Sequence, residues 1–546
     1  MHFPELFETL LKERGITEEE VEDFLNPDYS KLHDPFLLPD MERASDRVIK
    51  AIKDNEHIVV FSDYDADGIP GAVVLSDFFS RIKYENISFY IPHRHDEGYG
   101  LNREAIEECF KRAAKLIITV DCGIADTSEV SFANELGINV VITDHHEPGE
   151  ILPDAFAIVN PKRKDSKYPF NPSSGGLCGS AVIFKLVQAV LSKESFGLKL
   201  GMEKWSLDMV AIATLSDMVA LVGENRILAR FGLSVLRKSP RIGLAALLKK
   251  LNINQRNISE DDIVFMITPR INAASRMGVP YDAFKLLSTQ SQSEAEELVS
   301  HLEKINNERK GVVASMVREA KSNLSKRDKI SEVVVIGNPK WRPALLGLVA
   351  NSLVEEYSRP VFVWGRDGDG VLKGSCRSYN GYDLFALMNV ASDMFIEFGG
   401  HARAGGFSIT LENLTELQEK LSKVLTSLEC PENKVSEKSG LVINISDVGE
   451  NLWEVISKFA PFGMGNEKPI FKIPKAEIKS VRQFGKTNEH LELTLVPNIK
   501  AISFFSSLTT YSLLPTSRTC TLLANLEKSY FRDRPELRLR IVDILT

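Results

Sequence analysis

The chain has 546 residues, which at about 100 to 200 residues per domain is enough for three or four domains with substantial cores. Hydrophobic residues make up 43% and charged residues 26% of the sequence, a composition that excludes extensive disorder and fibrous structure. The formal net charge of -9 argues, taken alone, against a general polyanion binder. The acidity lies in residues 1–439, because residues 440–546 carry 14 Lys and Arg against 11 Asp and Glu, a net charge of +3.

No run approaches the roughly 18 apolar residues that a membrane helix needs, and the acidic, amphipathic N-terminus is unlike a cleavable signal. The six cysteines are scattered without a CxxC pair, which favours reduced thiols over disulfides or a zinc site. We therefore expect a cytoplasmic location and no membrane partner.

The first third of the chain has the pattern of a doubly wound α/β fold. Residues 1–45 are expected to form a helical segment, followed by an α/β lobe at 46–255. Within this lobe short apolar runs alternate with amphipathic stretches, which predicts a parallel sheet covered by helices. The expected strands are 57–61, 87–91, 116–120 and 138–143, and the expected helices are 71–81, 103–114 and 126–136.

The rest of the chain predicts a connector, a second α/β lobe and a β domain. Residues 256–328 are expected to connect the lobes, with one long, highly charged helix at 293–325. The second α/β lobe is expected at 329–432, with strands at 332–336, 360–364 and 371–376 and a helix at 344–357. Strand patterns dominate residues 440–546 and predict a small closed or sandwich-like β domain. Its expected strands are 441–445, 475–483, 490–496, 500–505, 519–526 and 536–542.

Acidic residues follow three strands of the first lobe, at the point where each strand ends. They are Asp63, Asp65 and Asp67 after the first strand, Asp121 after the third, and Asp144 with His145 and His146 after the fourth. Carboxyl ends of parallel strands share one sheet edge, where open α/β folds bind ligands. Carboxylates about 4 Å apart repel by roughly 4 kcal/mol at an effective dielectric of about 20, so the cluster must protonate or hold cations. Oxygen-rich ligands with one or two imidazoles suit Mn2+ or Mg2+, and the number of ligands predicts two ions.

Each motif also has a simpler interpretation. The segment 63–68 could open an EF-hand loop, but Val74 stands where the twelfth-position Glu is required, and a strand precedes the motif. Asp121 alone could cap a helix, and the histidines at 145–146 could be solvated loop residues. Asp217 lies in a strongly apolar stretch, where either metal ligation or a buried helix cap would explain it. The coincidence of three motifs at equivalent positions favours the metal site.

Glycine-rich segments at 374–378 and 399–406 carry residue types that bind phosphate. Glycines let backbone amides approach an anion, and Ser, Arg and His supply charge-assisted donors. The candidate phosphate ligands are Ser375, Arg377 and His401 in these segments, and Arg94, Asn272 and Arg276 elsewhere. Structural loop roles would also explain these residues. The sequence has no Walker A motif, no GxGxxG after a strand and no GxSxG elbow.

In their order along the chain, these motifs resemble the DHH phosphoesterase superfamily and, within it, the single-strand-specific exonucleases. The matching segments are 63–68, 120–123, 144–146, 216–217, 272–276, 375–377 and 399–406. The resemblance implies an α/β fold with a parallel-sheet DHH lobe and a DHHA1 lobe joined by a long helix, plus a C-terminal OB-like β domain.

The resemblance also implies roles for the candidate residues. Metal ligands would be Asp65, Asp67, Asp121, His145 and Asp217, with Asp121 bridging two ions. Asp63 and Asp144 would either bind a metal directly or hold the direct ligands in place. His146 would face the scissile phosphate and would be a catalytic residue together with Asp121. Ser375, Arg377, His401 and Arg94 would hold the terminal phosphate or the adjacent backbone.

The activity that the resemblance implies is hydrolysis of single-stranded DNA from 5′ to 3′, with release of 5′-mononucleotides, in DNA repair and recombination. Single-stranded DNA is the expected partner, and a single-strand-binding protein and a helicase are candidate protein partners. One alternative is a phosphodiesterase acting on short oligonucleotides or cyclic dinucleotides. Another is a noncatalytic DNA-binding scaffold, against which the intact acidic motifs argue.

The C-terminal β domain favours the exonuclease over its shorter relatives, because an OB-like fold offers a positive groove with stacking aromatics. The segment 461–466 resembles the one that enters this domain in the single-strand-specific exonucleases. A basic cluster follows it, made of Arg532, Arg534, Arg538 and Arg540 near Tyr530 and Phe531. A solvated basic face would have the same composition.

Overall fold

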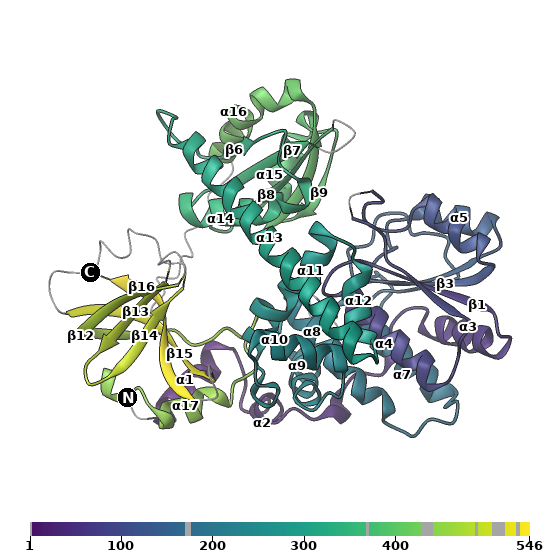
Figure 1. Ribbon diagram of the computed structural model, residues 1–546, viewed down its shortest axis with the longest axis horizontal. Coiled ribbons are helices and arrows are strands. Elements are labelled where there is room, and N and C mark those ends of the chain that lie inside the picture. Colours follow the sequence, from purple (N-terminus) through teal and green to yellow (C-terminus); the bar gives the residue numbers. More distant parts are fainter. Residues whose placement is uncertain are drawn as a thin grey trace. The chain divides into compact units, whose positions relative to one another are not determined.

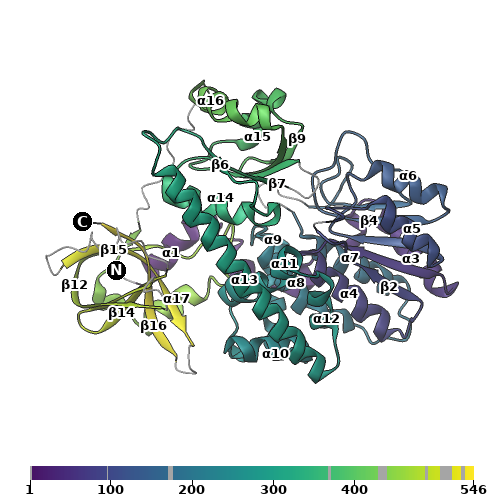
Figure 2. The ribbon, with the colours of Figure 1, turned by 45° about the horizontal axis from the view of Figure 1, so that its top comes forward.

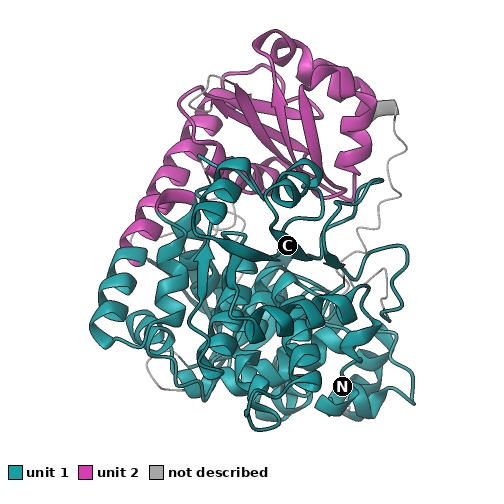
Figure 3. Cartoon of the chain, turned by 90° about the vertical axis from the view of Figure 1, so that its right-hand side faces the viewer, with its two compact units in different colours: residues 1–275, 279–302, 439–546 teal, residues 276–278, 303–438 magenta. Residues whose placement is uncertain are grey.

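The structure is a computed structural model that describes residues 3–94, 96–169, 176–366, 371–427, 440–485, 490–504, 519–530 and 535–545. The chain divides into two compact units, which Figure 3 colours separately. One unit contains residues 1–275, 279–302 and 439–546, and the other contains residues 276–278 and 303–438. Among the described residues, no helix has both the length and the apolar character needed to cross a membrane.

A five-stranded, wholly parallel sheet organises the first unit (Figure 1), in the order β2-β1-β3-β4-β5. Its strands are β1 (His57–Ser62), β2 (Ile87–Tyr90), β3 (Ala114–Val120), β4 (Asn139–Thr143) and β5 (Ala157–Val159). The helices around it are α3 (Met41–Lys53), α4 (Gly68–Arg81), α5 (Arg103–Lys111), α6 (Thr127–Glu135) and α7 (Gly179–Lys193).

Both faces of this sheet are covered, which is why its strands are continuous apolar runs rather than alternating ones. Helices α3, α4 and α7 pack with one set of strand side chains, including Val60 and Ile118. Helices α5 and α6 pack with the opposite set, including Phe61 and Ile117. The predicted parallel, doubly wound lobe is confirmed.

A group of helices extends the first of these cores. They are α8 (Leu207–Ser216), α9 (Gly223–Leu236), α10 (Ile242–Leu251), α11 (Thr268–Met277) and α12 (Tyr281–Ser288), followed by α13 (Gln292–Leu324). Buried side chains from Ile258 to Leu302 belong to this same core, so the early part of the expected connector packs with the first lobe. Helix α13 is the expected long helix, with 33 residues, and it begins in one unit and ends in the other.

The second unit is a mixed five-stranded sheet in the order β6-β7-β8-β10-β9. Its strands are β6 (Val334–Gly337), β7 (Val361–Arg366), β8 (Leu372–Arg377), β9 (Glu397–His401) and β10 (Ala404–Ile409). Only β6 and β7 pair in parallel, and the other pairs are antiparallel. Helix α14 (Pro343–Tyr357) packs on one face with α13, and α15 (Leu384–Val390) and α16 (Leu411–Ser427) pack on the other.

The C-terminal strands form a closed barrel (Figure 2), because β12 pairs with both β13 and β15. Its strands are β12 (Phe471–Phe484), β13 (His490–Leu495), β14 (Ile499–Ser503), β15 (Thr519–Ser529) and β16 (Glu536–Leu545). The short strand β11 (Leu441–Val442) adds to β12 in parallel. Closure leaves no long unpaired edge among the described strands, and the expected OB-like domain is confirmed. Of the predicted basic cluster, Phe531, Arg532 and Arg534 lie outside the described residues, as does position 505 of an expected strand.

The first part of the expected N-terminal helical segment belongs to the core of this barrel, and its last part, from Tyr29 on, packs with the core of the first lobe. Helix α1 (Phe3–Glu13) places Leu6 and Leu10 one turn apart on one face, and both are fully buried among barrel side chains such as Phe471. Helices α2 (Val21–Leu25) and α17 (Glu450–Ser457) complete this cluster. The two ends of the chain therefore share one hydrophobic core.

Replacing Leu10 by Ala should destabilise the barrel by about 2 to 5 kcal/mol, because a buried leucine leaves a cavity when truncated. The effect is best followed by amide hydrogen exchange in β12 and β15, since a chain with several domains has no single unfolding free energy. Leu200→Ala is the matched control, because Leu200 is fully exposed. Equal exchange in the two variants would contradict the shared core.

Candidate metal centre

The acid-bearing loops are fixed to one another along the carboxyl edge of the parallel sheet. The N–H of Asp63 donates to Val120 O at 3.0 Å, and the N–H of Asp121 donates to Thr143 O at 3.0 Å. The N–H of Asp144 continues the series by donating to Val159 O at 3.1 Å. Each loop is thus anchored to the end of the next strand. The strand order reverses between β1 and β3, and this reversal is the place where open α/β sheets bind ligands.

Asp67 is oriented by the start of helix α7. Its two carboxylate oxygens accept hydrogen bonds from Gly179 N at 2.6 Å and from Ser180 N at 2.7 Å. A side chain at Gly179 would come within 2.6 Å of the Asp121 Cβ, so only glycine permits this close approach. The first amides of the helix thereby stabilise a carboxylate.

Asp65 and Asn272 shape the loop that leads to Asp67. Asp65 Oδ1 accepts the N–H of Asp67 at 2.7 Å and that of Gly68 at 3.2 Å. Asn272 Oδ1 accepts the N–H of Ala66 at 3.0 Å. Asn272, which sequence reasoning assigned to substrate binding, therefore contacts the loop between the two predicted ligands.

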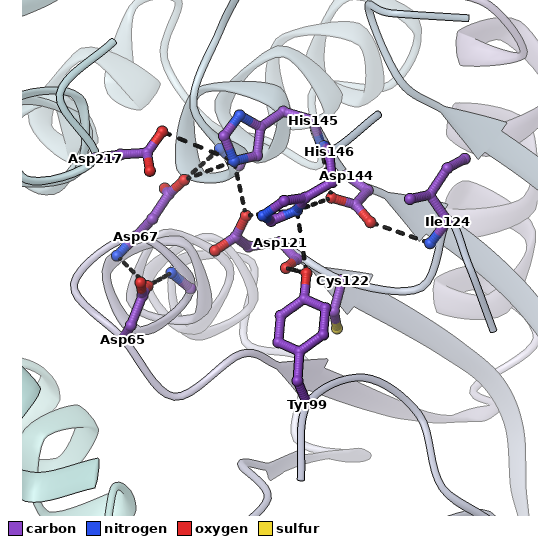
Figure 4. A network of polar contacts seen from close by, with 12 residues as sticks. Asp65, Asp67, Tyr99, Asp121, Cys122, Ile124, Asp144, His145, His146 and Asp217 are labelled. Carbon is purple, nitrogen blue, oxygen red and sulfur yellow. Dashed lines mark hydrogen bonds and ion pairs between the residues drawn. The ribbon is translucent and has the colours of Figure 1, made fainter. Parts of the chain in front are cut away.

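His145 lies at the centre of the cluster (Figure 4). Its Nε2 is 3.1 Å from Asp121 Oδ1 and 3.7 Å from both Asp67 Oδ2 and Asp217 Oδ2. Asp217 follows the last residue of α8 and faces these side chains. The structure thus brings together residues from four separate segments of the sequence.

Burial and mutual repulsion raise the pKa values of the carboxyl groups. Burial and the Asp65 carboxylate raise the pKa of Asp67 to about 6. Burial and neighbouring carboxylates raise the pKa values of Asp63, Asp121 and Asp217 well above the ordinary value. Burial and the adjacent His146 lower the pKa of His145 to about 3, so its imidazole is neutral and suited to metal ligation.

The cluster has the donor set of a hard divalent cation. Among the described side chains, Asp63 Oδ1, Asp121 Oδ1 and His145 Nε2 are buried without a hydrogen-bond partner, which is costly unless something else satisfies them. Ligand atoms lie within 4.8 Å of one another in three groups: Asp121, His145 and His146; Asp67, His145 and Asp217; Asp63, Asp65 and Asp121. Carboxylate oxygens with imidazole nitrogen fit Mn2+ or Mg2+. Asp121 and His145 each belong to two of the groups, and the bridging role of Asp121 stays a prediction.

Asp144 and His146 form a pair beside this cluster. Asp144 is fully buried, and its oxygens accept hydrogen bonds from the N–H groups of Ile124, His145 and His146 and from His146 Nδ1 at 2.8 Å. Of the two roles expected for Asp144, this saturation favours support of the ligands over direct contact with a metal. Burial is the largest single effect on His146 and opposes its charge. The hydrogen bond to Asp144 and the charges of Asp144, Asp217 and Asp67 together outweigh burial and raise the pKa of His146 to about 9.

Tyr99 contacts the same cluster, and sequence reasoning missed it. Its hydroxyl donates to Asp121 O at 2.8 Å and lies 3.0 Å from His146 Nδ1 (Figure 4). Its only sequence signal was its presence in the loop that contains Arg94. The guanidinium of Arg94 lies 4.9 Å from the Tyr64 ring and lowers the pKa of Asp63 against the stronger effect of burial, which places this cation at the cluster.

The candidate phosphate ligands of the second unit lie on one sheet face. Ser375 pairs with Gly406, and Arg377 pairs with Ala404, which in turn pairs with His401. Because paired residues in an antiparallel sheet share a face, the three polar side chains surround small residues. The glycine-rich segment at 399–406 therefore lies mostly in the hairpin of β9 and β10.

Two glycines keep this face accessible. A Cβ at Gly399 would meet no atom within 4 Å, and one at Gly406 would meet only Gly374 O at 3.7 Å. Gly347 on α14 makes room for Arg377, whose Nη2 would lie 2.7 Å from an added Cβ. The hydrogen bond described for Arg276 is donated to Ala344 O at 2.6 Å, in helix α14 and not on this sheet face.

Three family models match the chain, in an order that follows the structure. The DHH family N-terminal domain matches residues 57–214, the DHHA1 domain matches 328–427 and the RecJ OB domain matches 441–543. The crystal structure of RecJ in complex with Mn2+ from Thermus thermophilus superposes with a TM-score of 0.80 at 25% identity, covering 98% of this chain and 75% of that one. A manganese-bound exonuclease RecJ gives a TM-score of 0.61 at 30% identity, covering 73% and 97%.

The proteins with similar sequences are also RecJ exonucleases by name. The single-stranded-DNA-specific exonuclease RecJ of Bacillus subtilis is 35% identical over 91% of this chain, which spans 62% of that relative's length. The protein of that name from Haemophilus influenzae is 30% identical over 93% of this chain and 91% of its own. Because this second relative matches along nearly its whole length, and the three domains recur in the same order, the chain belongs to the RecJ family of DHH proteins.

Proposed function

We propose that this chain is a metal-dependent exonuclease that degrades single-stranded DNA from the 5′ end and releases 5′-mononucleotides. The observation that carries the proposal is the set of buried ligand atoms without hydrogen-bond partners at the sheet reversal, in a member of the RecJ family. Three further expectations stay predictions. They are the role in DNA repair and recombination, the cytoplasmic location, and the partnership with a single-strand-binding protein and a helicase.

The residues that would hold Mn2+ or Mg2+ in this proposal are Asp65, Asp67, Asp121, His145 and Asp217, and Asp121 belongs to two of the groups of ligand atoms. Asp63 adds a ligand atom beside Asp65, and Asp144 orients the two histidines. Bound ions would supply a nucleophilic water of lowered pKa and neutralise charge on the phosphate oxygens.

The side chains around the ligands would bind and orient the phosphodiester. His146 is half-exposed, and its raised pKa favours an imidazolium that can donate to a phosphate oxygen. Arg94 adds a second cation near Asp63. In the second unit, Ser375, Arg377 and His401 offer donors over an open glycine-rich face, which suits a terminal phosphate.

The barrel would bind the part of the single strand that lies beyond the nucleotide being cleaved. The rings of Phe484, His490 and Phe504 pack with centroids 5.0 to 6.1 Å apart. The guanidinium of Arg540 lies 4.0 Å from the Phe504 ring, and that of Arg538 lies 5.8 Å from it. Aromatic rings with arginines provide the stacking and charge that bind single strands without sequence preference.

The proposal is tested by a time course on 5′-labelled and 3′-labelled DNA, single-stranded and duplex, with Mn2+, Mg2+ or EDTA. We expect early release of the 5′ label as mononucleotide, slow loss from duplex and no reaction in EDTA. Asp121→Asn should abolish hydrolysis and leave strand binding intact, and Asn suits the variant because it tolerates the left-handed φ of 62° at this position. Preferential cleavage of dinucleotides over long strands would instead identify a short-oligonucleotide phosphodiesterase.

Mn2+ affinity should rise with pH through about 6 and above, because protons compete with the metal for carboxylates of raised pKa. An exposed aspartate, with a pKa of about 4, would already be ionised at about pH 5.5 and would give no such rise. Calorimetric Mn2+ titrations between about pH 5.5 and 7.5 measure both the affinity and the protons released.

Asp67→Asn should weaken Mn2+ binding and flatten this pH dependence. Asp262→Asn is the matched control, because burial also raises the pKa of Asp262, which lies outside the cluster. A pH-independent Mn2+ affinity in the wild-type protein would count against the carboxylate site.

Arg540→Ala should weaken binding of a long single strand by about 5- to 10-fold, since loss of one stacking contact costs about 1 kcal/mol or more. Dinucleotide hydrolysis should be unchanged. Arg103→Ala is the matched control, because Arg103 lies 4.1 Å from the Phe132 ring in the first lobe. If both variants bind the strand equally well, the barrel rings are not the strand-binding surface.

A further inference from the structure

We propose that Tyr99 is a positioning residue that holds the Asp121 main chain and the His146 ring in the geometry that phosphodiester hydrolysis needs. The inference rests on the proposed function. Its basis is the location of the Tyr99 hydroxyl between these two residues (Figure 4).

The hydroxyl joins the Asp121 carbonyl to the His146 ring. It donates its single proton to Asp121 O at 2.8 Å, so it can only accept at His146 Nδ1, 3.0 Å away. The same Nδ1 lies 2.8 Å from Asp144 Oδ1, which is also an acceptor. Both neighbours therefore require a proton on Nδ1, and this leaves Nε2 as the ring atom available to a substrate oxygen.

The Asp121 main chain needs such support. Its φ of 62° lies in the left-handed region, which only a small share of residues other than glycine adopt. The N–H of Asp121 is held by Thr143 O, and its carbonyl is held by the Tyr99 hydroxyl. With both polar atoms of this residue's main chain held, the direction in which its Cα–Cβ bond leaves the main chain is fixed.

Two carboxylates fix the loop that carries Tyr99. Glu97 accepts from the N–H of His93 at 2.6 Å and from the Tyr90 hydroxyl. Asp126 accepts from the N–H of Leu101 at 2.6 Å, and a Cβ at Gly100 would lie 2.6 Å from its Oδ2. Gly100 also has a φ of 85°, so the loop is built for this close approach. The position of Tyr99 is therefore set from both sides.

Packing in a core would not explain the arrangement, because 49% of the Tyr99 surface is exposed. Within the cluster its ring meets the His146 ring edge to face, with centroids 5.6 Å apart, and its hydroxyl contacts Asp121 O and His146 Nδ1. The exposed ring could instead contact the DNA directly. These two roles differ in the kinetic constant that they affect, since a positioning residue changes kcat and a strand contact changes KM.

The test compares Tyr99→Phe with Tyr84→Phe, which removes a hydroxyl that also donates to a main-chain carbonyl in the same lobe. We expect Tyr99→Phe to lower kcat on single-stranded DNA by about 10- to 100-fold with KM unchanged within about 2-fold. The affinity for Mn2+ alone should fall by about 10-fold, while the melting temperature in EDTA stays within the change caused by Tyr84→Phe.

A change in KM alone would show that Tyr99 contacts the strand and would overturn the inference. Equal kinetics in the two variants, or a fall in activity matched by a fall in melting temperature, would overturn it as well. The Mn2+ titration separates this inference from the proposed function. Absence of nuclease activity in the wild-type protein would refute the function, whereas Mn2+ binding unaffected by Tyr99→Phe would refute the positioning role.

Discussion

Mutual repulsion among buried carboxylates is the constraint around which the first lobe is built. Asp63, Asp67, Asp121 and Asp217 lie close together with little solvent, and their pKa values are raised as a result. Such a cluster opposes folding in its charged form, and divalent cations that bind only the folded chain would reverse that cost. If the proposed ions bind, they would contribute to the stability of the first lobe as well as to its chemistry.

The surrounding fold maintains the cluster through backbone donors. These donors are the sheet-edge amides, the first amides of α7 and the amides that donate to Asp144. The barrel segment extends this support to Asp217, since Leu221 N donates to Met464 O at 2.7 Å four residues farther along. A side chain at Gly463 would come within 2.9 Å of Leu221 Cδ1. The loop that carries a predicted metal ligand is therefore packed against the segment that enters the C-terminal barrel.

Local pattern was enough to predict the parallel sheet and the residues at its edge, because strand periodicity and the position after each strand are properties of neighbouring residues. Contacts between distant segments leave no such pattern. The burial of Leu10 in the barrel joins the two ends of the chain, and the Tyr99 hydroxyl reaches two loops that follow other strands. Asn272 carries an amide that suits phosphate, but its oxygen binds Ala66 N. The sequence showed the chemical type of these residues and not their partners.

The net charge of -9 gains a different meaning once the charges are located. A substrate phosphate would not meet the average charge of the chain, because the field at a site is set by the nearest groups. At the cluster, bound divalent ions would offset the carboxylates, and Arg94 and His146 add positive charge beside them. The C-terminal residues 440–546 carry a net charge of +3 and place two arginines beside an aromatic ring. An acidic protein can therefore present a cationic surface to a nucleic acid wherever the strand makes contact, provided that the metal sites are filled first.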